Sequence, residues 1–168
     1  KFETYRTELS ESINKTKIHL SQLLGMLLAR VEDYIETEQF KKAYSKIKLR
    51  EKDIESEIKE SHKKIKNLVR EYNKLSNNFE TKNKHLIRDF DSFINEFQDI
   101  LIEKVKSSEE QILKVYVQMA IKAVAREVLT LNFLHNELKI KKQVIQKHLI
   151  SIISADQLSG KYDPLLGI

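Results

Sequence analysis

The chain contains no cysteine, one proline and three glycines among its 168 residues. The absence of cysteine excludes disulfides, thiol nucleophiles and zinc-thiolate sites, and it fits a cytosolic or nuclear setting. A β-protein or an α/β enzyme needs many turns, and glycine and proline usually mark them. Here no glycine occurs between Gly25 and Gly160, and Pro164 is the only proline. The chain is therefore predicted to be all-α and built from a few very long helices.

Hydrophobic runs that could cross a membrane are also missing. The densest run, residues 20–31, is shorter than the roughly 18 residues that a span needs, and polar residues interrupt it. No signal segment opens the chain, and the first residue is not methionine, so the sequence is compatible with a fragment of a longer protein. We therefore expect an intracellular protein of the cytoplasm or nucleus.

Sequence patterns of catalysis are absent as well. The chain has no Gly-rich phosphate loop, no His-Glu-x-x-His and no Gly-x-Ser-x-Gly motif. Its histidines are scattered and do not form the pairs at three or four residues that metal sites on helices use. The acidic stretch from Asp89 to Glu103 carries phenylalanines at helical spacing, which indicates a solvated flank beside a core. We expect a non-enzymatic protein with no cofactor, no metal and no small-molecule substrate.

Most of the sequence shows the apolar spacing of amphipathic helices. Apolar residues recur at intervals of three and four along three segments, residues 2–37, 40–106 and 108–154. Ser108 followed by Gln111 forms a capping-box pattern, which predicts the start of the third helix. We predict an elongated antiparallel bundle or coiled coil of about three long helices. It would form a single domain over residues 1–156, followed by a flexible tail over 157–168.

An apolar ladder with a seven-residue repeat runs along the middle segment, a pattern typical of a coiled coil. Its members are Ile58, Ile65, Tyr72, Phe79, Leu86, Phe93 and Ile100. The companion positions shift around the helix between Phe79 and Leu86. The helix therefore either continues and changes neighbours, or breaks near residues 76–78, where serine and asparagine compete with the helical backbone. Continuity is the favoured interpretation, and it implies a rod of roughly 100 Å at a rise of 1.5 Å per residue.

A middle helix of that length cannot be covered along its whole length by two shorter helices. The remaining apolar surface calls for a partner, because its exposure to water is unfavourable. The sequence thus predicts a protein-interaction or scaffolding module that homo- or hetero-oligomerises through its helices as part of a larger assembly. The predicted seam consists of the ladder together with Leu24 and Leu28, near which the first helix is apolar on almost every side.

The net charge of +5 is spread unevenly along the chain. Two lysine clusters predict an anion-facing patch, although acidic residues are interleaved with the first cluster. The patch comprises Lys41, Lys42, Lys46, Lys48, Lys63, Lys64, Lys139, Lys141 and Lys142. An anionic membrane surface is one target for such a patch. Nucleic acid is not an expected partner, because lysine far outnumbers arginine and the aromatic residues lie on the predicted buried stripe.

The segment from Lys74 to Tyr116 resembles the last long helix of sorting-nexin BAR domains. The resemblance covers about a quarter of the chain and lies in Phe79, Leu86, Phe90, Phe93, Phe97, Leu101 and Ile102. It implies, as an alternative function, a dimerising module on the cytosolic face of a curved anionic membrane. The helix predicted after residue 107 departs from the pattern, because such domains usually lack it, and the chain is not assigned to that family.

Overall fold

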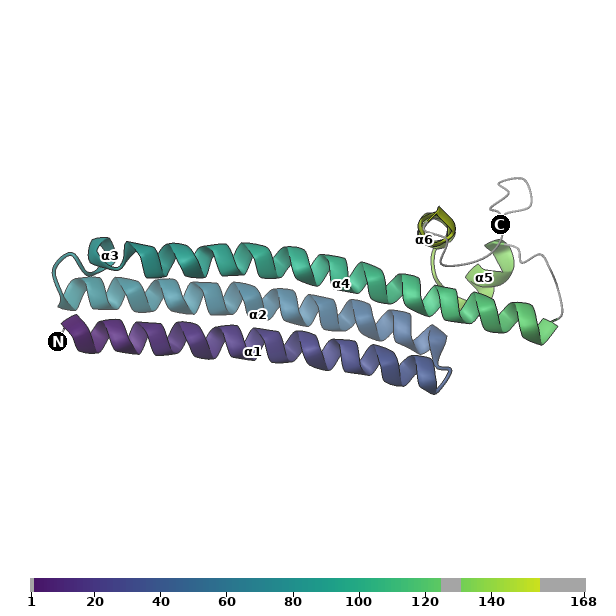
Figure 1. Cartoon of the computed structure of the whole chain (residues 1–168), viewed down its shortest axis with the longest axis horizontal. Coiled ribbons are helices and arrows are strands. Elements are labelled where there is room, and N and C mark those ends of the chain that lie inside the picture. Colours follow the sequence, from purple (N-terminus) through teal and green to yellow (C-terminus); the bar gives the residue numbers. More distant parts are fainter. Residues whose placement is uncertain (1, 125–130, 155–168) are drawn as a thin grey trace. The chain divides into compact units, whose positions relative to one another are not determined.

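A computed structural model of the chain describes residues 2–124 and 131–154 (Figure 1). The elements in these residues are α1 (Phe2–Glu36), α2 (Phe40–Leu75), α3 (Phe79–Lys82), α4 (Lys84–Val124), α5 (Leu131–Leu138) and α6 (Lys142–Ser154). Within the described ranges every element is a helix, so the all-α prediction is confirmed. None of the helices described is long and apolar enough to span a membrane.

Polar residues with left-handed backbone conformation mark the turns between helices. Glu38, between α1 and α2, has a φ of 58°, and Asn78, between α2 and α3, has the same φ. Asparagine tolerates this conformation better than most residues. After α3, the side-chain amide of Asn83 donates a hydrogen bond of 2.9 Å to the carbonyl oxygen of Phe79 and so caps the C-terminal end of this short helix. The chain therefore leaves helical geometry at residues 76–78.

The prediction of one continuous helix over residues 40–106 is wrong, and the rod of roughly 100 Å inferred from it is wrong as well. α2 ends at Leu75, Ser76 to Asn78 form a turn, and Asn83 separates α3 from α4 within the stretch where the companion residues of the ladder shift. Serine and asparagine side chains compete with helical hydrogen bonds, and here they accompany a real break. The shift in the apolar pattern thus marked a turn.

The predicted helix start at Ser108 is also wrong. α4 passes through this position, and the hydroxyl of Ser108 donates to the carbonyl oxygen of Lys104 at 2.8 Å, one helical turn earlier. Val105 and Ile112 are both buried, so the apolar stripe of α4 continues across the supposed boundary. The segment predicted as one helix over 108–154 is instead the second part of α4, then α5 and α6. The predicted tail over 157–168 lies outside the described residues, and the single domain over 1–156 stays a prediction.

The chain divides into two compact units. The first comprises Lys1–Leu27 and Arg50–Glu103, and the second comprises Leu28–Leu49 and Lys104–Ile168. α1, α2 and α4 each contribute residues to both units, because their bounds cross these divisions. The two units are described separately below.

In the first unit, α1 and α2 run in opposite directions. The ring of Tyr5 stacks on that of Tyr72 with 4.9 Å between centroids, whereas His19 lies 3.6 Å from the carboxylate of Glu57. Moving forward along α1 thus means moving backward along α2, as Figure 1 also shows. The hydroxyl of Tyr72 donates to Glu8 at 2.7 Å, and burial together with this hydrogen bond raises the pKa of Tyr72 to about 12.

The part of α4 in the first unit runs in the same direction as α1. The guanidinium of Arg6 donates to the side-chain oxygen of Asn83 at 2.8 Å, and the ammonium of Lys17 lies 5.4 Å from the ring centre of Phe93. Aliphatic and aromatic side chains fill the space between the helices. The largest of those that are fully buried are Leu9, Leu20, Ile58, Phe79, Phe90 and Leu101.

The second unit packs residues of α1, α2, α4, α5 and α6 around its own apolar core. The rings of Phe40 and Tyr116 meet edge to face at 5.4 Å. Between α5 and α6, Lys139 has a φ of 58°, and a ring nitrogen of His135 lies 2.6 Å from the carbonyl oxygen of Ile140. The largest fully buried side chains of this unit are Ile47, Ile112, Leu113, Leu134, Leu138 and Ile145.

Candidate binding groove

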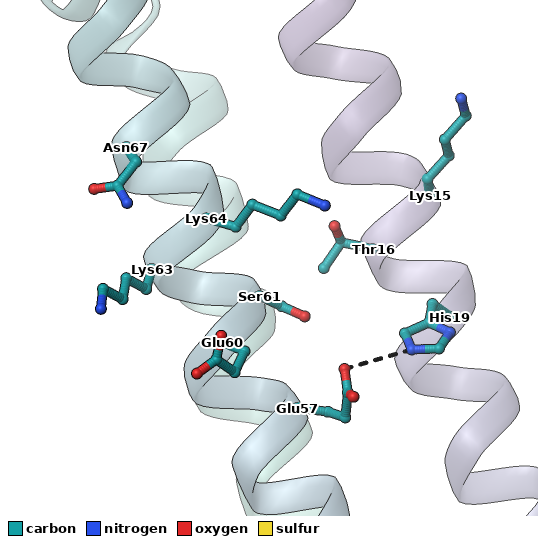
Figure 2. Close-up of a pocket in the computed structure, with 9 residues that line it drawn as sticks. All are labelled: Lys15, Thr16, His19, Glu57, Glu60, Ser61, Lys63, Lys64 and Asn67. Carbon is teal, nitrogen blue, oxygen red and sulfur yellow. Dashed lines mark ion pairs between the residues drawn. The ribbon is translucent and has the colours of Figure 1, made fainter.

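A groove lies between α1 and α2 in the first unit (Figure 2). Its main part has a volume of about 630 Å³ and is lined by Lys15, Thr16, His19, Glu57, Glu60, Ser61, Lys63, Lys64 and Asn67. A second hollow of about 390 Å³ shares Lys15, Thr16, Lys64 and Asn67 with it and adds Ser12, Ile65, Leu68 and Glu71. Because the two hollows share these residues, we treat them as one feature, the α1–α2 groove.

Two short hydroxyl side chains at core positions open the groove. Thr16 lies three residues after the buried Ile13 and four before the buried Leu20, a spacing that belongs to the apolar stripe of α1. Ser61 takes the same place on α2, between two buried isoleucines. In the register set by Tyr5 with Tyr72 and by His19 with Glu57, Thr16 and Ser61 fall into the same layer. A layer with two small residues leaves space that larger apolar side chains would fill.

Lysine supplies the cations of the groove. The ammonium of Lys64 points across the gap toward α1, while Lys63 extends away from the gap (Figure 2). Lys15 lies on the opposite helix and also lines the groove. Within the described residues, none of these three lysines forms an ion pair, whereas Glu57 is paired with His19 at 3.6 Å. The groove also contains three glutamates, Glu57, Glu60 and Glu71, so its lining carries charge of both signs.

Hydrogen-bonding groups line the same central layer. The hydroxyl of Thr16 donates to the carbonyl oxygen of Ser12 at 2.8 Å, which leaves its oxygen free to accept. The hydroxyl of Ser61 and the ammonium of Lys64 can both donate. Ile65 and Leu68 contribute apolar surface to the adjoining hollow. The groove therefore places hydrogen-bonding groups beside apolar surface.

A buried ion-pair cluster is the main polar feature of the second unit. One oxygen of Glu109 lies 2.8 Å from the ammonium of Lys48, and the other lies 2.8 Å from a ring nitrogen of His148. The second ring nitrogen of His148 lies 3.5 Å from Glu110. Burial raises the pKa of the Glu109 carboxyl, but hydrogen bonds from His148 and Lys48 and their charges outweigh it, so the pKa is lowered. The cluster ties α6 to α4 and α2.

The structure places most of the predicted seam inside the chain. Ile58, Ile65, Tyr72, Phe79 and Leu24 are buried, while Leu28, Leu86 and Phe93 are half-buried. Ile100 is the exposed member of the set, with 44% of its surface accessible. The ladder therefore packs mainly against the helices of its own chain, because the turn at 76–78 folds α4 back beside α2. A partner role at Ile100 stays a prediction.

The predicted anion-facing patch divides between the two units. Lys63 and Lys64 line the α1–α2 groove of the first unit, and the other seven lysines belong to the second unit. Among these, Lys48 is engaged with Glu109. The exposed members of the second unit are Lys41, Lys42, Lys46, Lys139, Lys141 and Lys142. The sequence did not single out Lys15, Thr16 or Ser61, because their proximity depends on the register between two helices.

Comparison with known proteins identifies no match for the chain. No family model matches it, and no curated protein or solved structure matches it either. Function must therefore be argued from the surfaces of the molecule itself. Within the part of the chain that the structure describes, no group of three or more acidic, histidine or cysteine residues is placed to hold a metal ion.

Proposed function

We propose that this chain is a non-enzymatic helical protein-interaction or scaffolding module. Its long helices would form an antiparallel bundle that assembles with a second copy, or with another helical subunit, inside a larger intracellular assembly. The observation that supports the proposal is the set of large apolar side chains that stay exposed on the long helices. Ile18 and Met26 on α1, Leu75 on α2 and Ile102 on α4 each keep more than half of their surface accessible.

Exposed apolar surface favours association because its burial contributes about 25 cal/mol per Å². Single exposed apolar residues are common on monomers, so their number alone would mean little. Here they accompany a groove whose lysines form no ion pair with any residue that the structure describes, and an exposed Ile100 within the predicted seam. Together these features supply both the apolar and the charged contacts that helical interfaces use.

Self-association is the direct test of this proposal. We expect light scattering coupled to size-exclusion chromatography to give a mass above that of one chain, rising with protein concentration. The exposed apolar side chains would then be at least partly covered in the assembled form. A mass equal to one chain at every concentration would contradict the proposal.

The alternative, a membrane-surface module acting through lysine clusters, predicts a different outcome. The chain would sediment with vesicles that contain acidic lipid and remain in solution with neutral vesicles, since each lysine near such a surface contributes about 1 kcal/mol. Charge-dependent sedimentation of a chain that stays monomeric in solution would replace the scaffolding proposal with the membrane one. Assembly in solution without sedimentation would support scaffolding.

A further inference from the structure

A buried histidine of the second unit faces a carboxylate with each of its two ring nitrogens. Nε2 of His148 lies 2.8 Å from Glu109, and Nδ1 lies 3.5 Å from Glu110. His148 and Glu109 are buried, and Glu110 is half-buried. Within the described residues, neither Nδ1 of His148 nor the facing oxygen of Glu110 forms a hydrogen bond. The gap of 3.5 Å therefore separates two buried polar atoms that have no other hydrogen-bond partner there.

The number of protons on the His148 ring decides whether both contacts are favourable. A neutral imidazole carries a proton on one nitrogen and a lone pair on the other. In either neutral tautomer, one lone pair of the ring would face a carboxylate oxygen, which repels it. The doubly protonated ring presents an N–H to both Glu109 and Glu110. The placement of α6 against α4 therefore fits the charged ring.

The charges around His148 favour the same state. Lys48 of α2 lies 2.8 Å from the other oxygen of Glu109, so the cluster contains one ammonium and two carboxylates. A neutral His148 would leave the cluster with one net negative charge, and a protonated His148 makes it neutral. Burial alone disfavours a charged ring, but opposite charges in contact with it offset that cost.

α5 also packs against α6, and it carries two titratable residues of its own. Glu137 is exposed. The ring of His135 contacts the carbonyl oxygen of Ile140 through Nδ1 at 2.6 Å. A neutral ring can make that contact with a single N–H, so losing a second proton does not break it. Of the two histidines in the second unit, His148 is thus the one whose contacts need both protons.

We propose that His148 is a pH-sensitive switch, which holds α6 on α4 and α2 while its ring is doubly protonated and releases α6 when the ring loses a proton. Because the docked form binds this proton in preference, docking is complete at mildly acidic pH and is lost as the pH rises. The loss is expected between about pH 6 and 9, since histidine changes charge near neutral pH and two carboxylates favour the charged ring. The acid limit set by Glu109 is separate and lies below pH 4.5.

Release has a structural consequence on α6 itself. Ile145 and Leu149 are fully buried and lie within one helical turn of His148, on the same side of the helix. Separation of α6 from the rest of the second unit would expose both side chains to water. The switch therefore links the charge of one ring to the exposure of apolar surface, and it does not depend on self-association.

Two measurements on the full chain test the switch. The nitrogen-15 chemical shifts of the His148 ring distinguish the doubly protonated form from either neutral tautomer. Hydrogen exchange of the α6 amides, corrected for its intrinsic dependence on pH, reports docking. At about pH 6 we expect two protons on the ring and slow exchange. Toward about pH 9 we expect the ring to lose one proton and the protection to fall by up to about tenfold per pH unit, the limit for one linked proton.

Glu110→Gln separates the switch from a general effect of pH. The amide of the introduced glutamine can donate to Nδ1, so a neutral His148 ring keeps both of its contacts and α6 should stay protected up to about pH 9. Glu137→Gln is the matched control, because it removes the same charge from an exposed position of the same unit. It should keep the pH dependence of the original chain.

Several results would overturn the proposal. One is a His148 ring that carries a single proton at about pH 6, and another is a ring that keeps both protons up to about pH 9. A third is protection of α6 that stays constant while the ring loses its proton. The fourth is a Glu110→Gln variant whose α6 amides show the same pH dependence as those of the original chain.

Discussion

Replacing Phe79 with alanine is expected to lower the free energy of unfolding of the first unit by about 3–5 kcal/mol, the usual loss when a buried phenylalanine is truncated. The side chain of Phe79 is fully buried, and its ring meets those of Phe2, Tyr5 and Tyr72 at centroid distances of 5.6, 6.5 and 5.4 Å. Truncation removes apolar burial and edge-to-face contacts and leaves a cavity. Urea denaturation followed by far-ultraviolet circular dichroism measures the loss.

The position of Phe79 makes this effect specific to the fold. It is the first residue of α3, directly after the turn at Asn78, so its ring anchors the point at which the chain reverses between α2 and α4. Leu75→Ala is a suitable control, because Leu75 is 65% exposed and its truncation should change the free energy by no more than about 0.5 kcal/mol. A loss for Phe79→Ala as small as that of the control would mean that the turn does not pack as described.

Replacing Glu109 with alanine is expected to destabilise the second unit by a similar amount, about 3–5 kcal/mol, the loss measured when one member of a buried ion pair is removed. The carboxylate accepts contacts of 2.8 Å from both Lys48 and His148, and its removal leaves the buried His148 without that partner. Because His148 lies on α6, we expect α6 to separate from α4 first. Hydrogen exchange of the α6 amides should accelerate, and denaturation should report the loss of free energy.

The carboxylate of Glu109 also makes the stability of the second unit depend on pH. Its pKa in the folded chain is lowered from the ordinary value of 4.5, so the folded state favours the ionised form. Its contribution to stability is therefore complete above pH 4.5 and is lost as the pH falls through the lowered pKa. The difference in unfolding free energy between the original chain and Glu109→Ala should shrink in that acid range. Glu137→Gln, at an exposed position of the same unit, should follow the original chain at every pH, and a constant difference for Glu109→Ala would contradict the assignment.

Helical periodicity predicted much of this fold. The three- and four-residue spacing of apolar side chains predicted helices throughout, and α1 ends at Glu36, one residue before its predicted end. The sequence allowed either a break at residues 76–78 or a continuous helix, and it favoured the continuous helix. Ser and Asn lower helix stability only modestly, so the outcome depended on what Phe79 gains by packing against α1, which sequence spacing does not reveal.

The capping pattern at Ser108 failed for the opposite reason. A serine followed three residues later by glutamine resembles a helix start, but the buried stripe from Val105 to Ile112 keeps the helix continuous, and Ser108 bonds back to Lys104. The α1–α2 groove was not predictable from either helix alone. Thr16 and Ser61 become one layer only when the antiparallel register of α1 and α2 is known.

Assembly through the described surfaces can be tested most directly by zero-length crosslinking of an equal mixture of isotope-labelled and unlabelled copies. A carbodiimide joins amines to carboxylates that are in contact, and mass spectrometry separates links within one chain from links between a labelled and an unlabelled chain. The account predicts mixed-label links between an amine of one copy and a carboxylate of another. Links confined to single chains, at concentrations well above those of the light-scattering measurement, would contradict it.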